Sequence, residues 1–360
     1  MRYMKGAVIA GKGKMAIKDN CPVPSVDEIV PTGALIKPLV WSPCTSDAHL
    51  CETGCESLPY LIGKPVGHEM CGEVVAVGPD VHDFKPGDKV IVDAVMPIWR
   101  SLEAQDGNAK SKSDNMYWGI DYPDRGGSFV EEYYIRDADM NLAHIPDGVT
   151  LEQAIMIPDM MCTAFEGVSK LDLKFGETVM VVGIGPVGLM VVRACVLHGA
   201  GRIFAIGSRK HCQEIARDFG ATDIVDYHDE GYLDQILKAN GKPVDRVMVA
   251  GGSQDAISKG LSVMKNGGTL VNLDALFQKP TISIDAKAWG FGYADKTIKG
   301  VGCGGGRLLM DRMAALIEYD RVHPEKLITH TFHGMDSIPE AMQLFLDHDR
   351  SLIKPVIYNE

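Results

Sequence analysis

The stretch TVMVVGIGPVGL, residues 178–189, decides the fold of the second half of this chain. It begins with Thr178–Val182, a short apolar run rich in β-branched residues, which is typical of a fully buried strand. Three glycines follow, Gly183, Gly185 and Gly188, and then an apolar, helix-compatible segment. A strand, a Gly-x-Gly-x-x-Gly turn and a helix in this order predict a site for the pyrophosphate of a dinucleotide.

Each glycine of this turn has a mechanical role. Gly183 makes the tight turn, Gly185 allows the pyrophosphate close to the backbone, and Gly188 lets the helix pack against the strand. The start of the helix, which contains Pro186 and Val187, presents unpaired N–H groups and partial positive charge to the phosphates. We therefore expect these five residues to bind the cofactor.

Strand-like and helix-like segments alternate after the glycine turn. This alternation predicts an α/β fold, with a parallel sheet covered by helices on both faces. The expected strands are 178–182, 202–206, 223–226, 245–250 and 269–273, and the expected helices are 187–198, 209–219, 231–239 and 254–264. The pattern stops near residue 300, because a helix at 307–318, another near 337–347 and a strand at 352–358 do not extend it.

The first part of the chain has a different character. Short strand-like runs separated by Gly, Pro and Asp make residues 1–92 rich in β structure. Residues 95–127 are polar and irregular, which suggests a long surface loop. The composition becomes strand-like again over Ser128–Ile135 and helical over residues 151–170. The clearest of the early strands are Ala34–Val40, Glu73–Val77 and Lys89–Val92.

Length and charge exclude several classes of protein. With 360 residues, the chain is longer than one hydrophobic core usually grows, so we expect two domains. A formal net charge of −12 without a basic patch argues against a nucleic-acid partner. No apolar run approaches the roughly 20 residues that span a bilayer, and the apolar run in MRYMKGAVIAGKGKMAI is too short for a signal peptide. We therefore expect no membrane partner and a cytoplasmic location.

The nine cysteines do not indicate a disulfide framework, because their number is odd and the chain is long. Most are expected to be small buried side chains, and some can be metal ligands. They stand at positions 21, 44, 51, 55, 71, 162, 195, 212 and 303.

The turn after the second expected strand indicates which dinucleotide binds. At this position, roughly 20 residues past the glycines, an NAD site has Asp or Glu to bind the ribose 2′-hydroxyl. This chain instead has Gly207, Ser208, Arg209 and Lys210. A hydroxyl and a cation bind a 2′-phosphate, and no carboxylate is present to repel it. The alternative is that Arg209 and Lys210 only begin a solvated helix, but their position at the ribose-reading turn favours NADP(H).

Candidate metal ligands are scattered along the chain. His68 and Glu69 lie in GKPVGHEM, Cys44 lies in SPCTSDAH, and Asp159 lies in IPDMMCT. Taken singly, each residue has an ordinary explanation, since a lone His is more often a satisfied core or surface residue and a lone Cys is more often buried filler. Their spacing is not local, so it does not match a zinc-finger pattern.

Several motifs together resemble the medium-chain, zinc-dependent alcohol dehydrogenases. The broad matches are GHE at 67–69, KPGDKV at 85–90 and GIGPVGLM at 183–190. Other stretches are similar to a narrower group, the tetrameric NADP-dependent secondary-alcohol dehydrogenases of anaerobic microbes. These stretches are SPCTSDAH, DADMNLAHIP (137–146), IPDMM, GAGRIFAIGSRK (199–210), GATDIVDY (220–227), KTIKG (296–300) and LIKPV (352–356).

The resemblance implies a catalytic zinc in each subunit. The family's Cys, His and Asp ligands fall on Cys44, His68 and Asp159, and its accessory carboxylate, which ligates when the substrate site is empty, falls on Glu69. Three protein ligands leave one position for water or the substrate oxygen. Many relatives hold a second, structural zinc with four closely spaced cysteines, but residues 72–161 contain none. We therefore expect one zinc per subunit and no structural zinc.

The resemblance also implies hydride transfer between NADP(H) and a secondary alcohol or ketone, with aldehydes as additional substrates. Ser46 matches the hydroxyl residue that carries the alcohol proton outwards, and His49 matches the next member of the relay, although a turn hydroxyl and a surface histidine are the alternatives. Tyr227 falls among the cofactor-binding positions. The implied substrate pocket consists of Ala94, Trp118, Ala275, Gly302 and Cys303. Ala275 and Gly302 are smaller than the residues common in relatives, so we expect a pocket that accepts bulkier substrates.

The family's architecture predicts two domains. Residues 1–162 and 304–360 would form a β-rich, GroES-like catalytic domain, and residues 163–303 a Rossmann NADP-binding domain with a doubly wound parallel sheet. The active site would lie in the cleft between them. The alternatives are a zinc enzyme for a polyol or an amino alcohol, and a non-catalytic dinucleotide-binding protein related to zinc-free quinone reductases. The joint presence of Cys44, His68 and Asp159 argues against the second alternative. A homotetramer is expected from the resemblance only.

Overall fold

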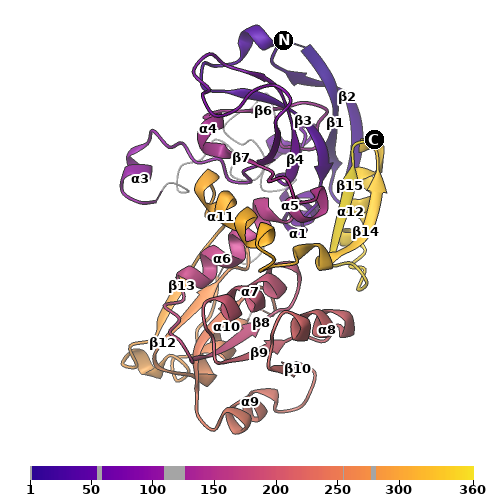
Figure 1. The fold of residues 1–360 in the computed structure, drawn as a ribbon. Helices are drawn as coiled ribbons and strands as arrows, with labels where there is room; N and C mark the ends of the chain where they lie inside the picture. The colour runs from indigo at the N-terminus through magenta and orange to yellow at the C-terminus, as the bar shows by residue number, and fades with distance from the viewer. Residues whose placement is uncertain (1, 55–58, 109–125, 254, 277–280) are drawn as a thin grey trace. The chain divides into compact units, whose positions relative to one another are not determined.

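The computed structural model describes residues 2–54, 59–108, 126–253, 255–276 and 281–360. The chain divides into two compact units. The first unit comprises Met1–Cys162 and Gly304–Glu360, and the second comprises Thr163–Cys303 (Figure 1). Both ends of the chain therefore belong to one unit, and the other unit is inserted between them. Within the described residues, we find no helix with the length and apolar character needed to cross a bilayer.

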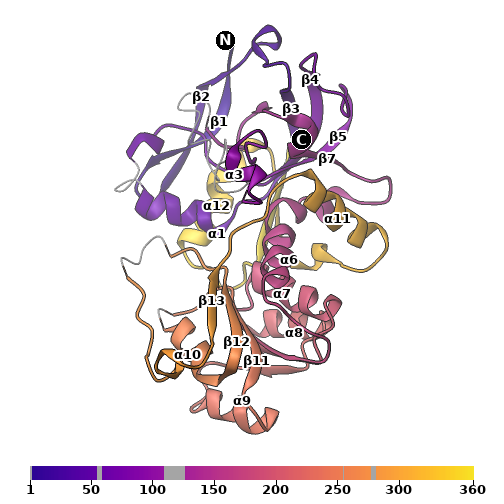
Figure 2. The same cartoon turned by 90° about the vertical axis from the view of Figure 1, so that its left-hand side faces the viewer.

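A six-stranded parallel sheet forms the centre of the second unit, with the strand order β10-β9-β8-β11-β12-β13. Its strands are β8 (Thr178–Val182), β9 (Arg202–Ile206), β10 (Asp223–Val225), β11 (Val244–Val249), β12 (Met264–Asn272) and β13 (Thr297–Gly300). Its helices are α6 (Cys162–Ser169, which starts at the boundary), α7 (Pro186–Leu197), α8 (Lys210–Asp218), α9 (Tyr232–Asn240) and α10 (Ala256–Val263). Figure 2 shows α7 and α8 on one side of the sheet and α10 on the other. The doubly wound α/β fold expected from the sequence is confirmed.

The order of the strands follows from simple packing rules. Strands β8 and β11 are buried over nearly their whole length, and so is the second half of β12, Gly268–Val271, as expected for a sheet covered on both faces. The chain runs from β8 outward to β10 and then returns past β8 to β11, so the helices before this return and α10 after it cover opposite faces of the sheet. The sequence pattern missed β13, because TIKG is short, half-exposed and not a continuous apolar run. This strand lies at the edge of the sheet.

The first unit is built mainly from antiparallel strands. Strands β1 (Arg2–Gly11) and β2 (Lys14–Val23) form a two-stranded sheet. A seven-stranded sheet has the order β14-β15-β3-β4-β5-β7, with β6 paired to β3. Its strands are β3 (Ala34–Trp41), β4 (Met70–Val77), β5 (Lys89–Val92), β6 (Tyr133–Ile135), β7 (Leu142–His144), β14 (Ile328–His333) and β15 (Lys354–Tyr358). The β-rich domain of the expected GroES-like fold is confirmed.

Short helices connect the strands of the first unit. They are α1 (Thr45–His49), α3 (Leu102–Gln105), α4 (Ala138–Asn141), α5 (Leu151–Ala154), α11 (Arg307–Glu318) and α12 (Ile338–Leu346). Two π-helical turns cover Leu50–Gly54 and Ile157–Met161. Over the described residues of both units, 3-10 turns cover Val26–Glu28, Pro59–Leu61, Gly290–Gly292, Pro324–Leu327 and Met335–Ser337.

The segment 151–170 is helical, as its composition indicated, but it is divided into three pieces. It consists of α5, the π-helical turn Ile157–Met161 and α6. Pro158 lies in the middle of this segment and has no N–H to continue a helical ladder. The break leaves Asp159 in a buried turn rather than on a regular helix. Similarly, α3 interrupts the polar segment 95–127, of which residues 109–125 lie outside the described part of the chain.

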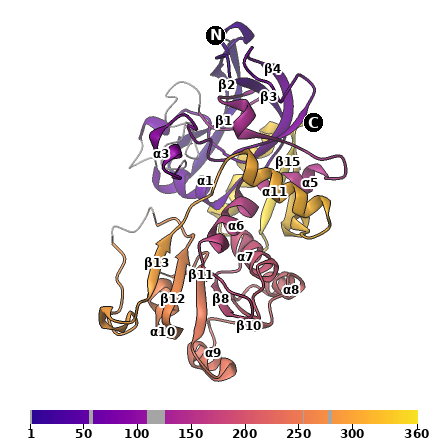
Figure 3. The ribbon, with the colours of Figure 1, turned by 60° about the vertical axis from the view of Figure 1, so that its left-hand side comes forward.

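The C-terminal segment completes the first unit. Helix α11 contacts β7 and the turn Ile157–Met161 (Figure 3). Strand β15 pairs antiparallel with β3, so that Ile357 lies opposite Trp41. This pairing brings Lys354, at the start of β15, close to the residues that follow β3.

Candidate metal centre and cofactor turn

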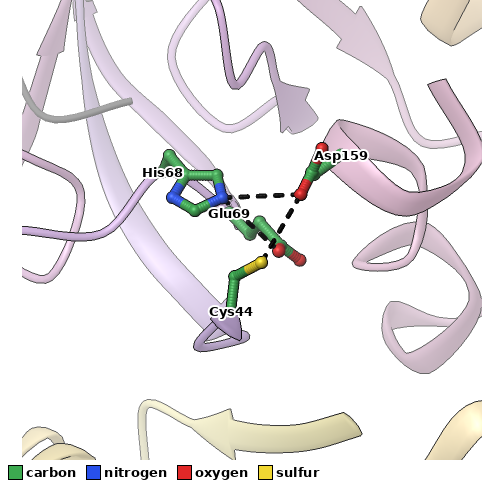
Figure 4. Close-up of side chains that lie close together, drawn as sticks. All are labelled: Cys44, His68, Glu69 and Asp159. Carbon is green, nitrogen blue, oxygen red and sulfur yellow. Dashed lines mark hydrogen bonds and ion pairs between the residues drawn. The ribbon is translucent and has the colours of Figure 1, made fainter. Parts of the chain in front are cut away.

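Four side chains of the first unit converge on one point: Cys44, His68, Glu69 and Asp159 (Figure 4). We call them the metal group. Each offers one ligand atom, and these atoms all lie within 4.8 Å of one another. His68 Nε2 lies 3.5 Å from Asp159 Oδ2 and 3.6 Å from Glu69 Oε1. Cys44 Sγ lies 3.7 Å from Asp159 Oδ2. The structure thus brings together side chains from three separate stretches of the sequence.

Strand pairing explains why distant residues meet. Cys44 follows the end of β3, and His68 and Glu69 directly precede β4. Since β3 and β4 are antiparallel neighbours with Trp41 opposite Met70, the end of one and the start of the other lie side by side. Asp159 comes from the π-helical turn Ile157–Met161, in which it is buried.

The spacing of the metal group fits a tetrahedral zinc ion. Zinc bonds of about 2.0–2.3 Å place neighbouring ligand atoms about 3.3–3.8 Å apart at the corners of a tetrahedron. The three distances of 3.5, 3.6 and 3.7 Å lie within this range. One thiol, one imidazole and carboxylates form a donor set that suits zinc.

The electrostatics of the metal group also favour a cation. Burial raises the pKa of the Cys44 thiol. Burial likewise raises the pKa of Glu69 to about 7, although Lys354 opposes this shift. Burial would lower the pKa of His68, but the negative charges around it, Asp47 foremost, raise it well above its ordinary value. A bound cation would favour the deprotonated forms of these side chains, which are the forms that ligate metals.

Asp47 links two members of the metal group. It is fully buried, and its Oδ1 lies 3.1 Å from His68 Nδ1. Its Oδ2 accepts a hydrogen bond of 3.0 Å from the backbone N–H of Cys44. With Nδ1 engaged, His68 offers Nε2 to a metal ion. The sequence analysis missed this residue, although it lies three positions after Cys44 in SPCTSDAH.

Lys354 is the second residue that the sequence analysis missed. Its side chain is 2 % exposed, and its Nζ donates to Glu69 Oε1 at 2.7 Å and to the carbonyl oxygen of Pro43 at 3.0 Å. Burial would lower the pKa of this ammonium group, but the anionic side chains around it, with Glu69 the strongest, raise it. The motif LIKPV, which resembles the family pattern, contained the only sequence signal for this contact.

The predicted relay residues Ser46 and His49 lie on α1, immediately after Cys44. Both are half-buried. Among the described residues, the Ser46 hydroxyl oxygen has no hydrogen-bond partner and is itself buried. A buried hydroxyl two positions from a metal ligand, with its bonding capacity unused by the described chain, is suited to contact a bound molecule.

The glycine turn of the second unit has the predicted shape. Gly183 has φ 86°, which favours glycine, and it follows β8 directly. A Cβ atom on Gly188 would lie 1.8 Å from the carbonyl oxygen of Gly183, so only glycine fits there. Gly185 precedes α7, whose first residues are Pro186 and Val187. This end of α7 presents backbone N–H groups in the way that phosphates require.

The ribose-reading turn lies beside the glycine turn. Arg209 precedes α8, and its Nη2 is 3.8 Å from the position that a Cβ of Gly185 would occupy. Ser208 Oγ bonds to the Tyr227 hydroxyl at 3.2 Å. The N–H of Gly207 donates to the carbonyl oxygen of Val225 at 3.0 Å. Arg209 therefore lies beside the predicted pyrophosphate position, and the hydroxyls of the neighbouring Ser208 and of Tyr227 are in contact with each other. These are groups that can bind a 2′-phosphate.

The predicted pocket residues divide between the units. Ala94 is buried in the first unit, next to the end of β5. Ala275, Gly302 and Cys303 belong to the second unit, in which Cys303 is buried. Trp118 lies outside the described residues. The pocket therefore stays a prediction.

Two family models match the chain. Residues 30–147 match the alcohol dehydrogenase GroES-like domain, and residues 186–318 match the zinc-binding dehydrogenase model. Two curated relatives are similar over nearly their whole length. The NADP-dependent isopropanol dehydrogenase of Thermoanaerobacter brockii is 44% identical over 98% of this chain and 99% of its own, and that of Clostridium beijerinckii is 43% identical with the same coverage. Among solved structures, alcohol dehydrogenase TADH from Thermus sp. ATN1 matches with a TM-score of 0.85 and 25% identity, covering 99% of both chains.

Proposed function

The chain belongs to the zinc-binding alcohol dehydrogenase family, and we propose that it interconverts secondary alcohols and ketones with NADP(H) as the hydride carrier. The metal group is the observation that carries this proposal, because its donor set and spacing fit a zinc ion that takes three or four protein ligands. The names of the two relatives support a secondary alcohol as the substrate. Aldehydes are further substrates, since they undergo the same chemistry.

In this proposal, Cys44, His68 and Asp159 hold the zinc ion. When bound, zinc supplies Lewis acidity that polarises the substrate oxygen and lowers the pKa of an alcohol. The two anionic ligands balance the charge of the ion, and the neutral His68 adds none. Asp47 holds His68 in the required tautomer through Nδ1.

Ser46 and His49 move the alcohol proton. The buried Ser46 hydroxyl accepts the proton from the substrate and passes it toward His49, which lies on the same short helix. The position of Ser46, two residues after Cys44, supports this role.

The second unit binds NADP(H). Gly183, Gly185 and Gly188, with the start of α7, hold the pyrophosphate. The cluster of Ser208, Arg209 and Tyr227 supports selection of the 2′-phosphate, because charge-assisted hydrogen bonds favour it over a 2′-hydroxyl. The cofactor-binding set, as proposed, is Gly183, Gly185, Pro186, Val187, Gly188, Gly207, Ser208, Arg209 and Tyr227.

The remaining parts of the proposal concern assembly and substrate size. The first unit would act as the catalytic domain and the second as the NADP-binding domain, with one zinc per subunit and four subunits in a cytoplasmic homotetramer. The pocket would include Ala94, Trp118, Ala275, Gly302 and Cys303. The small side chains at Ala275 and Gly302 support acceptance of ketones larger than acetone.

Steady-state oxidation of NADPH and of NADH against a panel of ketones, aldehydes, ketoses and amino ketones tests the function. We expect NADPH to be preferred to NADH by at least about tenfold, which corresponds to one charge-assisted hydrogen bond. Removal of zinc by a chelator is expected to abolish the activity, and added zinc to restore it. Equal use of NADH, a preference for ketoses or amino ketones, or full activity in zinc-free protein would contradict the proposal. Metal analysis that finds two tightly bound zinc ions per subunit would contradict the single zinc.

A further inference from the structure

Lys354 makes a buried contact with the accessory carboxylate of the metal group. Its Nζ lies 2.7 Å from Glu69 Oε1, and the exposed fractions of the two side chains are 2 % and 0 %. The two residues are 285 positions apart. A buried ammonium group requires compensation by anions or carbonyl oxygens, and Lys354 has both in Glu69 and Pro43.

Two hydrogen bonds hold the start of β15 against the segment before Cys44. Lys354 Nζ donates to the carbonyl oxygen of Pro43 at 3.0 Å, and Ser42 Oγ donates to the carbonyl oxygen of Pro355 at 2.7 Å. Ser42 and Lys354 are both buried. The ammonium group therefore has a fixed position from which it attracts Glu69.

One oxygen of Glu69, Oε1, faces both Lys354 and the position of the metal ion. Oε1 accepts from Lys354, and the same atom lies 3.6 Å from His68 Nε2, a distance that neighbouring zinc ligands have. Oε2 is buried and has no hydrogen-bond partner among the described residues. The ammonium group of Lys354 draws electron density from Oε1 through this hydrogen bond, so it competes with a metal ion for the same atom.

The charges of the site disfavour Glu69 as a permanent ligand of the metal ion. If Cys44, Asp159 and Glu69 were all ligands, their negative charges would exceed the charge of a zinc ion by one. A carboxylate that ligated permanently would also occupy the position that the substrate oxygen needs. The positive charge of Lys354 offsets the surplus and favours a Glu69 that is hydrogen-bonded instead of metal-bound.

We propose that Lys354 is a positioning residue that restrains Glu69 and so keeps the fourth metal position open to exchange. This inference rests on the proposed zinc site, but not on the identity of the alcohol or the cofactor. Without the ammonium group, Glu69 becomes a permanent fourth ligand, and exogenous ligands must displace it.

Cobalt(II) in place of zinc provides the test, because its visible absorption bands report the ligands directly. Imidazole is titrated into the cobalt-loaded wild type and into the cobalt-loaded variants Lys354→Met and Lys354→Gln, without cofactor or substrate. The glutamine variant has a polar amide but no positive charge to offset Glu69, so it provides a second measurement if the methionine variant does not fold. Lys296→Met is the matched control, since Lys296 is a half-buried lysine of the second unit that bonds to the carbonyl oxygens of Leu261 and Ala288.

We expect both Lys354 variants to need at least tenfold more imidazole than the wild type for half of the spectral change, and Lys296→Met to behave as the wild type. In a Glu69→Gln background, the replacement of Lys354 is expected to have no such effect, because the competing carboxylate is absent. An unchanged or lower midpoint in the Lys354 variants would overturn the proposal. The same tenfold increase in the Glu69→Gln background would also overturn it, since Lys354 would then act through Pro43 alone. Because the titration uses neither NADPH nor an alcohol, its failure is distinct from failure of the proposed function.

Discussion

Asp47 illustrates how one residue can set the geometry of a site without contacting the substrate. Its two carboxylate oxygens bond to His68 Nδ1 and to the backbone N–H of Cys44. The carboxylate thereby orients an imidazole and the chain that carries a thiol at the same time. Such a carboxylate behind a histidine ligand increases the ligand's basicity and holds its ring in place.

The variant Asp47→Asn is expected to bind zinc about 10- to 100-fold more weakly than the wild type. An amide has one acceptor oxygen, so it cannot serve both His68 and Cys44, and it carries no charge to strengthen the bond to the imidazole. Competition with a chromophoric chelator measures the zinc dissociation constant. Asp336→Asn is the control, because Asp336 is exposed in the same unit and pairs only loosely with Lys5. An equal dissociation constant for Asp47→Asn and Asp336→Asn would contradict the role of Asp47.

At the scale of elements, the turn between β8 and α7 contains glycines that are needed for two different reasons. At Gly188 the requirement is internal, because a Cβ atom would lie 1.8 Å from the carbonyl oxygen of Gly183. At Gly185 the chain leaves room, since φ is −79° and the nearest atom to a Cβ would be Arg209 Nη2 at 3.8 Å. The fold therefore does not require glycine at position 185, and we attribute this glycine to the proposed approach of the cofactor.

Two alanine substitutions in this turn are expected to have different effects. Gly188→Ala should lower the free energy of unfolding by about 1–3 kcal/mol or prevent folding, because the strand and helix must move apart. Gly185→Ala should leave the melting temperature nearly unchanged and weaken NADPH binding tenfold or more, because its methyl group occupies the place of the pyrophosphate. Thermal unfolding and a fluorescence titration with NADPH measure the two quantities. Normal NADPH affinity in Gly185→Ala would show that the cofactor does not approach the backbone there.

At the scale of the whole molecule, the C-terminal segment must return to the first unit before that unit is complete. Asp93, after β5, is fully buried and accepts hydrogen bonds from the backbone N–H groups of Val95 and Gly306. Gly306 precedes α11, so this carboxylate anchors the returning chain. Burial raises the pKa of Asp93 to about 6, although the hydrogen bonds oppose the shift.

The anchor at Asp93 is expected to depend on pH. Because its pKa is higher in the folded state than in the unfolded state, its contribution to stability is fully present below about pH 4 and is lost as the pH rises through about 6. Asp93→Asn has no such titration. The free energy of unfolding of the wild type, minus that of Asp93→Asn, should therefore fall by about 2–3 kcal/mol between pH 4 and pH 7. Denaturant unfolding of the zinc-loaded proteins at several pH values measures this difference, and a constant or rising difference would refute the assignment.

The sequence predicted most elements of the second unit, because their signals are local. The strand at 178–182 and the helices around 187–198 and 209–219 lie where apolar runs and turn residues indicated them. It failed at β13, a short edge strand without an apolar run, where pairing with β12 rather than local propensity determines the conformation. Residues 151–170 are helical as expected, and the break between their helices lies at Pro158.

The sequence by itself determined where the glycine turn and the proposed reader of the 2′-phosphate lie, because both depend on residues that are adjacent in the chain. The conformation of Gly183–Gly188 follows from the steric limits of its own residues. The position of Ser208 and Arg209 follows from the end of β9 directly before them. Only the tertiary structure decided which residues surround the metal group. Asp47 and Lys354 have no local signal for their roles, and Lys354 reaches Glu69 across 285 residues once β15 pairs with β3. The physical reason is that a metal site requires its ligands to have compensated charges and fixed positions. Both depend on contacts between side chains that meet only when distant strands pair.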